Sequence, residues 1–582
     1  MLTTNSFIRF NLILLVILIS LTQISVAQKS SEEDPLYSGK ARFHPVLAKN
    51  GMVASENSYA TEAGLQVLKE GGNAVDAAVT VGFTLAVTFP RAGNLGGGGF
   101  MLVYLADKDK VISIDYREKA PLKANRDMFL DQNGNVDKEK SQNSILSAGV
   151  PGTVAGLAMA LEKYGTITLE RALQPAIELA QNGFPMYHEL IKSLGQAKNR
   201  MEKSPGSMEI FYKENGETYQ EGELLIQEDL AWSLKQIADN GPQAFYNGEI
   251  AQKISSFMEQ NGGLITTQDL KAYKTVTRKP VKGNYRGYEI YSMPPPSSGG
   301  IHLIQMLNIL EQFPLSSFGH NTAKTIHIFA ETMKHAYADR SKHLGDPDFS
   351  PIPVSGLTSE KYAEFLKEQI NMKRATPSSE ILPGDPMPDE GINTTHFSVM
   401  DSKGNAVSNT YTLNFSYGSK ITVPGTGILL NNEMDDFSAK PGSPNAYGLI
   451  GGKLNSIAPE KRMLSSMSPT IVIKDDEPFL VTGSPGGSRI ITTVLQVIIN
   501  VIDFNMNISE ATNAVRVHHQ WLPDVLNVET GLNKDTISIL REMGYKVEMG
   551  RTIGVAESIM KKGDYLYGAS DPRRPGGLTA GY

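Results

Sequence analysis

The fold of this chain is decided at residues 393–400, which read NTTHFSVM. A polar, proline-rich run from Ala375 to Asn393 precedes them and is typical of an exposed loop. From Thr394 onward the side chains alternate with the two-residue period of a β-strand. Residues 401–405, DSKGN, have turn chemistry, and residues 406–414 alternate again. The sequence therefore predicts a β-hairpin that opens at a pair of threonines.

The predicted hairpin brings two threonine hydroxyls together. If Met400 pairs with Ala406 across the turn, Thr394 lies opposite Thr412 with both side chains on one face. A threonine hydroxyl is a weak nucleophile, but the α-amine of a threonine that begins a chain can remove its proton. That amine has an unperturbed pKa of roughly 7.7–8.0. The pattern favours a precursor cut between Asn393 and Thr394; the alternative is a β-branched pair opening an ordinary strand.

Composition excludes several classes of function. The chain has 582 residues, of which 40% are hydrophobic and 20% charged, as in ordinary globular proteins. A net charge of −7 without long basic runs argues against a nucleic-acid partner. The absence of cysteine removes disulfides, thiol nucleophiles and thiolate metal sites.

The first 27 residues are expected to be a signal peptide. Arg9 precedes a mostly apolar run over residues 10–26, and small residues at Ser25 and Ala27 match a signal-peptidase site. Cleavage after Ala27 would deliver the protein to the periplasm or the medium, where a cysteine-free bacterial protein is at home. The alternative is an N-terminal membrane anchor, since the run is nearly long enough to span a bilayer.

Helical and strand segments alternate through the rest of the chain. Helical spacing occurs over residues 74–87, 153–163, 169–182, 227–239 and 322–341. The glycine run at 93–99 precedes an apolar strand instead of a helix, which indicates close approach of two backbones and not a dinucleotide fingerprint. A strand over 111–117 ends at Arg117, which is either solvated or a fork for a carboxylate.

Three further stretches carry candidate chemistry. Residues 431–438, NNEMDDFS, form a solvated or metal-binding acidic loop or, alternatively, an ammonium site of carboxylate and amide oxygens. Residues 439–463 are rich in Gly, Pro, Asn and Ser and long for a loop; loops of this length tend to be either lids or disordered segments. Residues 483–488, GSPGGS, lie between a strand and an apolar helix, where exposed backbone N–H groups form either an oxyanion hole or a simple turn.

Four blocks together resemble the γ-glutamyltransferase (γ-glutamyltranspeptidase) family. They are TTH at 394–396, NNEMDDFS at 431–438, LSSMSPT at 464–470 and GSPGGSR at 483–489. The match extends from about Ala54 to Tyr582. It implies an α+β fold, the four-layer αββα sandwich of the N-terminal nucleophile hydrolases. It also implies self-cleavage into a large subunit, 28–393, and a small subunit, 394–582, that stay together as a heterodimer in one domain.

The resemblance also implies the site residues. Thr394 is the nucleophile, and Thr412 is its hydroxyl partner. The residues that hold the donor's α-amino group are Asn414, Glu433 and Asp436, those that hold its α-carboxylate are Arg117, Ser465 and Ser466, and those that donate to the oxyanion are Gly486 and Gly487. Some bacterial members have glutamine at position 433. The loop 441–453 resembles the lid of some bacterial members, with Tyr447 as the cover.

The implied reaction is γ-glutamyl transfer and hydrolysis. Thr394 attacks the γ-amide of glutathione or a related donor, and water or an amino acid or dipeptide acceptor resolves the ester. No metal or organic cofactor is expected, because amine, hydroxyl and backbone donors serve every proton and charge. Two rivals remain: an acylase for glutaryl-type β-lactam side chains, which has no ammonium to bind, and a non-catalytic exported binding protein.

Overall fold

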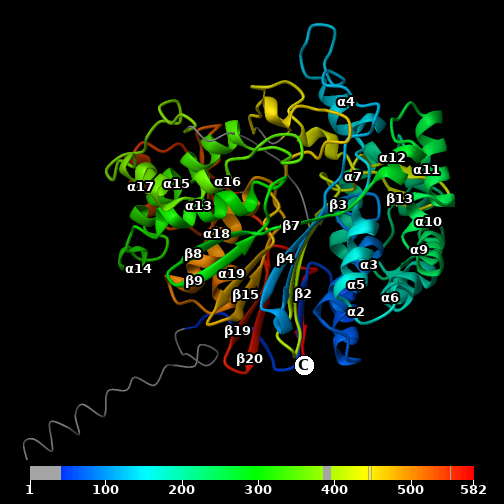
Figure 1. The fold of residues 1–582 in the computed structure, drawn as a ribbon, viewed down its shortest axis with the longest axis horizontal. Helices are drawn as coiled ribbons and strands as arrows, with labels where there is room; N and C mark the ends of the chain where they lie inside the picture. Colours follow the sequence, from blue (N-terminus) through cyan, green and yellow to red (C-terminus); the bar gives the residue numbers. More distant parts are fainter. Residues whose placement is uncertain (1–40, 385–394, 444, 447–448, 551) are drawn as a thin grey trace, which may run out of the picture. The chain divides into compact units, whose positions relative to one another are not determined.

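The predicted hairpin lies at the centre of a seven-stranded antiparallel sheet in the computed structural model of the protein (Figure 1). Its strands are β10 (Thr395–Met400) and β11 (Ala406–Thr412). Met400 pairs with Ala406, and Thr395 pairs with Tyr411. This register confirms the one predicted from the turn, although Thr394 itself lies outside the described residues.

The structure describes residues 41–384, 395–443, 445–446, 449–550 and 552–582. The chain divides into two units, Met1–His44 and Pro45–Tyr582, and the fold below is that of the second unit. Among the described residues no helix has both the length and the apolar character needed to cross a membrane.

Two large antiparallel sheets face each other. The sheet that contains the hairpin has the order β21 (Leu578–Gly581), β2 (Met52–Ser55), β10, β11, β3 (Gly98–Leu105), β4 (Lys110–Tyr116) and β7 (Val276–Arg278). The other has the order β1 (Val46–Ala48), β20 (Tyr565–Ser570), β19 (Glu557–Lys562), β15 (Glu477–Thr482), β14 (Thr470–Lys474), β9 (Tyr288–Ser292) and β8 (Val281–Tyr285). Apolar side chains fill the space between the sheets, including Phe100, Leu102, Ile471 and Ile559.

Helices cover the outer face of each sheet. The helices on the side of the hairpin sheet are α2 (Ser58–Lys69), α3 (Ala74–Thr88) and α5 (Thr153–Tyr164), which contact its strands, followed by α6 (Leu169–Asn182) on α3 and α9 (Glu228–Asn240) on α6. The other side carries α13 (Gly299–Leu310), α15 (Ala323–His343), α17 (Glu360–Glu368), α18 (Arg489–Ile502) and α19 (Ile508–Asn513). Figure 1 shows α13, α15 and α17 on one side of the sheets and α3, α5 and α6 on the other. The predicted α+β sandwich is confirmed.

The remaining elements are shorter or peripheral. The helices are α4 (Lys138–Asn143), α7 (His188–Met201), α8 (Pro205–Phe211), α10 (Gln243–Tyr246), α11 (Glu249–Gln260), α12 (Thr267–Ala272), α14 (Leu315–Phe318), α16 (Val354–Leu357) and α20 (Lys534–Glu542). The strands are β5 (Phe184–Pro185), β6 (Leu224–Leu225), β12 (Thr422–Val423), β13 (Ile428–Leu429), β16 (Val517–His518), β17 (Leu526–Val528) and β18 (Val547–Met549). The 3-10 turns are η1 (Ala106–Lys108), η2 (Ile145–Ser147), η3 (Glu433–Asp436) and η4 (Lys453–Asn455).

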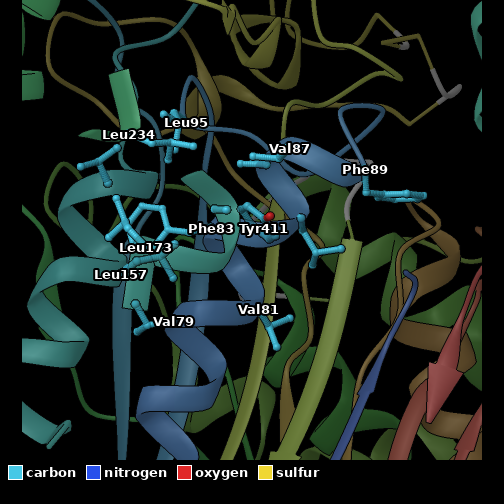
Figure 2. Packing of buried hydrophobic residues seen from close by; sticks show 14 of the residues in the cluster. Val79, Val81, Phe83, Val87, Phe89, Leu95, Leu157, Leu173, Leu234 and Tyr411 are labelled. Atoms are coloured by element: carbon cyan, nitrogen blue, oxygen red, sulfur yellow. The ribbon is translucent and has the colours of Figure 1, made fainter. Parts of the chain in front are cut away.

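Helix α3 is the centre of the larger core. It is buried on every side because it packs against the hairpin sheet and against other helices, and its sequence is accordingly mostly apolar. Figure 2 shows Phe83 of this helix with Leu157 of α5 and Leu173 of α6. Asn73 caps its first turn in a capping box with Asp76.

One row of residues, which crosses the hairpin sheet where its strands begin or end, positions the site. In order across four strands, the row consists of Thr395, Tyr411, Gly99 and Tyr116. Beyond it Thr412 pairs with Gly98, and Arg117 follows as β4 ends. A Cβ on Gly97 would overlap the carbonyl oxygen of Thr412, so the predicted close approach at the glycine run is confirmed.

Candidate active site

The start of β10 is held by a buried carboxylate. The Thr395 hydroxyl donates to Oε1 of Glu56 at 2.8 Å, and the His396 amide donates to the same oxygen at 3.2 Å. The other oxygen of Glu56 pairs with the Arg574 guanidinium. These contacts fix the backbone one residue beyond Thr394, the predicted nucleophile. The predicted partner Thr412 is buried, and its hydroxyl accepts from the Asn414 amide at 2.8 Å.

Arg117, Glu433 and Asp436 form a buried ionic cluster. The two Nη atoms of Arg117 lie 2.5 Å from Oε1 of Glu433 and 2.5 Å from Oδ2 of Asp436. Its Nε donates to the carbonyl oxygen of Met463 at 3.1 Å. The family resemblance implied that Arg117 and the two acids bind opposite charges of a ligand; in this structure Arg117 pairs with both acids. Such pairing is what buried charges require.

Burial sets the proton affinity of this cluster. It raises the pKa of Glu433 well above its usual range, and the neighbouring Arg117 opposes that shift. Burial likewise raises the pKa of Glu118 to about 7, again against the attraction of Arg117. Oε2 of Glu433 is buried and has no hydrogen-bond partner among the described residues. A cationic N–H donor at this point would therefore find an open acceptor.

Asparagines connect the acidic turn η3 to the end of β11. Asn414 adopts a φ of 71° and donates from Nδ2 to the carbonyl oxygen of Asn432 at 2.9 Å. The Asn432 amide donates in turn to the carbonyl oxygen of Leu413 at 3.1 Å. Asn431 donates to the carbonyl oxygens of Gly96 and Gly149. The turn is thus anchored to the same sheet edge as Thr412.

Ser465 and Ser466 directly follow the two residues whose backbone binds the Arg117 side chain. Arg117 contacts this segment through the carbonyl oxygens of Met463 and Leu464. The Ser465 hydroxyl accepts from the Met467 amide at 3.1 Å, and the Ser466 hydroxyl accepts from Nη2 of Arg340 at 2.5 Å. Both serines are buried, so their predicted role in carboxylate binding depends on contacts that a ligand would have to create.

Gly486 and Gly487 form the turn between β15 and α18. Their φ values are 134° and 70°, a region that favours glycine because it has no Cβ. Their carbonyl oxygens accept from the amides of Arg489 and Ile490, so the turn leads directly into the helix. The position at a helix N-terminus suits stabilisation of negative charge.

The predicted lid loop is partly described. Gly442 donates to Gly451 at 2.8 Å, and Asn445 donates to Leu449 at 2.9 Å, so the loop closes on itself near residues 442–451. Tyr447, the predicted cover, lies outside the described residues.

Sequence reasoning missed four residues around the site. They are Glu56, Arg574, Tyr273, which donates to the carbonyl oxygen of Arg117 at 2.8 Å, and Arg340. Glu56 follows a strand end, as Arg117 does, and that position was its only local signal. The others are recognisable only once distant segments are brought together. Within the described residues no group of histidine and acidic side chains could hold a metal ion.

Stacked antiparallel sheets between helical layers, with a threonine-led hairpin and a glycine turn at one edge, define the class of N-terminal nucleophile hydrolases. In keeping with this, the structure matches that of the cephalosporin acylase from Bacillus halodurans with a TM-score of 0.83, at 28% identity over 94% of this chain and 98% of that chain. The sequence model for Gamma-glutamyltranspeptidase matches residues 60–581, and the chain belongs to that family.

Two relatives support the family assignment. The chain is 56% identical to the glutathione hydrolase proenzyme of Escherichia coli K12 over 93% of each chain. It is 48% identical to the γ-glutamyltranspeptidase of Helicobacter pylori, whose structure covers 61% of this chain and 99% of that one with a TM-score of 0.57. The chain is accordingly an enzyme of γ-glutamyl transfer and hydrolysis, as the sequence predicted.

Proposed function

We propose that Thr394 is the nucleophile and that the precursor cuts itself at the bond between Asn393 and Thr394. The observation that carries this proposal is the arrangement of the strand ends. Thr412 and Gly98 form the next pair after the row that contains Thr395, and Arg117 follows the end of β4. Once the cut makes Thr394 the first residue of a chain, its free α-amine can act as the base for its hydroxyl. Relatives named as proenzymes support a precursor.

The donor binds through both charges of its glutamyl end. Its α-carboxylate pairs with Arg117, assisted by Ser465 and Ser466, and its α-ammonium lies among Asn414, Glu433 and Asp436. The α-carboxylate of the ligand takes the place of the two acids beside Arg117, and its α-ammonium takes the place of Arg117 beside the acids. Binding therefore replaces buried ion pairs by other buried ion pairs, and the net charge of the cluster does not change because the ligand brings one charge of each sign.

The reaction proceeds through a γ-glutamyl ester. The Thr394 hydroxyl attacks the γ-carbonyl carbon while its α-amine takes the proton, and the Gly486 and Gly487 amides stabilise the oxyanion. The protonated amine then donates this proton to the leaving nitrogen, the C–N bond breaks, and the γ-glutamyl ester remains. Water gives glutamate, and an amino acid or dipeptide gives a new γ-glutamyl amide. The donor class is glutathione and its γ-glutamyl relatives, and no cofactor takes part.

The two halves made by the cut stay together as a heterodimer. Strand β2 from the large subunit and β11 from the small one both pair with β10, and β3 pairs with β11. The sheet is continuous across the cut, and its hydrogen bonds and core remain after cleavage. The signal peptide over residues 1–27, with export to the periplasm or the medium, is part of the same proposal, and an N-terminal membrane anchor is its alternative.

A γ-glutamyl anilide assay tests the proposal. Wild-type protein should release the aniline and release it faster when glycylglycine is added. A denaturing gel should show two bands, with Thr-Thr-His-Phe as the N-terminus of the smaller. Thr394→Ala should give one band and no release of aniline. If this variant were cut at the same bond, the assignment of the nucleophile would be wrong.

A further inference from the structure

A cavity of about 650 Å³ lies among helices α5, α6, α10 and α12, outside the active site. Figure 1 shows these four helices on the same side of the two sheets. Neither the side chains of the Arg117 cluster nor the glycines at 486 and 487 line this cavity. A ligand bound in it would therefore leave the donor site free.

One wall of the cavity is apolar. It is formed by residues of α5, of the segment that follows α5 and of the start of α10, namely Ala155, Ala158, Met159, Ile167 and Pro242. Met159, Ile167 and Pro242 are only partly buried. Covering apolar surface of this kind is favourable, so the wall suits the apolar part of a ligand.

The opposite wall carries two lysines. Lys271 lies in the last turn of α12, and Lys274 follows three residues later. Both residues are exposed, and neither pairs with a carboxylate of another residue that the structure describes. One carboxylate, that of Glu162, also lines the cavity. Two ammonium groups against one carboxylate favour a ligand with a negative charge.

Two stacked tyrosines form the buried part of the wall and connect it to the donor site. The ring centroids of Tyr246 and Tyr273 lie 5.6 Å apart with an angle of 11° between the rings. The Tyr273 hydroxyl donates to the carbonyl oxygen of Arg117 at 2.8 Å. The Tyr246 hydroxyl donates to the carbonyl oxygen of Pro151 at 3.0 Å and accepts from the Ala155 amide at 3.2 Å. A ligand that packs on these rings therefore contacts a side chain that binds the backbone of Arg117.

We propose that this cavity is an effector site for a small amphipathic anion, with a flat apolar body and one carboxylate or sulfonate group. The apolar body packs against Met159 and the tyrosine rings, and the anionic group lies near Lys271 and Lys274. Contact with Tyr273 restrains the ring whose hydroxyl binds the carbonyl oxygen of Arg117. The donor carboxylate then meets an arginine that is already held in place, and the KM for the donor falls. This effect rests on the proposed function, whereas binding of the anion does not.

The first test measures binding with anilinonaphthalene sulfonate, an aromatic sulfonate whose fluorescence increases in apolar surroundings. A titration of wild-type protein should show one saturable site per chain. Ala155→Phe should abolish this site, because the larger side chain fills the cavity. Replacement of Lys271 and Lys274 together by glutamine should raise the Kd about threefold to tenfold, since each exposed ion pair contributes little.

Replacement of Lys279 and Lys282 together by glutamine is the matched control. These two lysines have the same spacing in the sequence and are also exposed, but they do not line the cavity. Their substitution should leave the Kd at the wild-type value. Equal Kd values in wild type and in the variant of Lys271 and Lys274 would overturn the proposal. This comparison decides the question even if Ala155→Phe does not fold.

The second test measures coupling to the donor site. The KM for a γ-glutamyl anilide should fall about fivefold when the sulfonate is present at saturation. Tyr273→Phe keeps the ring but loses the hydrogen bond to Arg117, so it should still bind the sulfonate while the KM no longer responds. Because coupling is reciprocal, glutamate should lower the Kd of the sulfonate by a similar factor in wild-type protein. A donor KM that is raised or unchanged by the sulfonate would overturn the effector role.

Failure of this inference and failure of the proposed function are distinguishable. If wild-type protein releases aniline but its sulfonate Kd is the same in the Ala155→Phe variant, the assignment of this cavity is wrong and the proposed function stands. If wild-type protein releases no aniline, the proposed function is wrong, and the fluorescence titrations still decide whether the cavity binds the anion.

Discussion

Replacement of Asp436 by asparagine should separate donors by their α-ammonium group. Oδ2 of Asp436 lies 2.5 Å from Nη2 of Arg117, and both side chains are almost completely buried. Loss of one member of a buried charge pair costs on the order of 2–5 kcal/mol. Since each 1.36 kcal/mol is about tenfold in rate, kcat/KM for γ-glutamyl donors should fall roughly thirtyfold to several-thousandfold.

The assay compares a γ-glutamyl anilide with the corresponding glutaryl anilide, which lacks the ammonium. Asp436→Asn should hardly change the glutaryl rate. Asp435→Asn is the control: Asp435 is also buried on η3, but it accepts from the Ser141 hydroxyl at 2.8 Å and does not contact Arg117. Its substitution should leave the preference between the donors unchanged.

Either of two results would refute this reasoning. A wild-type enzyme that prefers glutaryl donors would favour the acylase rival. An Asp436→Asn variant that slows both donors equally would mean that the carboxylate supports the fold and does not bind an ammonium.

Three further predictions follow from the same geometry. Thr412→Val should slow self-cleavage and turnover while the protein stays folded, because it keeps the side-chain shape and loses the hydroxyl; normal kinetics would discard its orienting role. Glu56→Gln should lower Tm and delay self-cleavage on a time-course gel, because it leaves Arg574 without a charged partner; unchanged Tm and maturation would contradict this. The donor KM should fall as pH rises above the usual carboxyl range, because burial raises the pKa of Glu433 and an adjacent ammonium favours its ionised form. Glu433→Gln should abolish this dependence, and a variant that retained it would point to another titrating group.

Local patterns in the sequence determined several elements closely. The alternation from Thr394 and the turn at residues 401–405 sufficed for the hairpin register, because a two-residue period admits few pairings once one face is buried. The predicted helix over 169–182 matches α6, and the one over 322–341 lies within one to two residues of α15. The segment after β7 forms two strands, β8 and β9, because Arg286 and Gly287 both adopt positive φ and turn the chain.

Only the tertiary structure decided how the site residues meet. Arg117 pairs with acids more than 300 positions away, and Glu56 binds Thr395 and Arg574, which are 339 and 518 positions from it. Periodicity specifies on which face of a strand a side chain lies, but not which residues of distant segments it will contact. That choice depends on the stacking of the two sheets and on the need of each buried charge for a partner, and both arise only when the whole chain has folded.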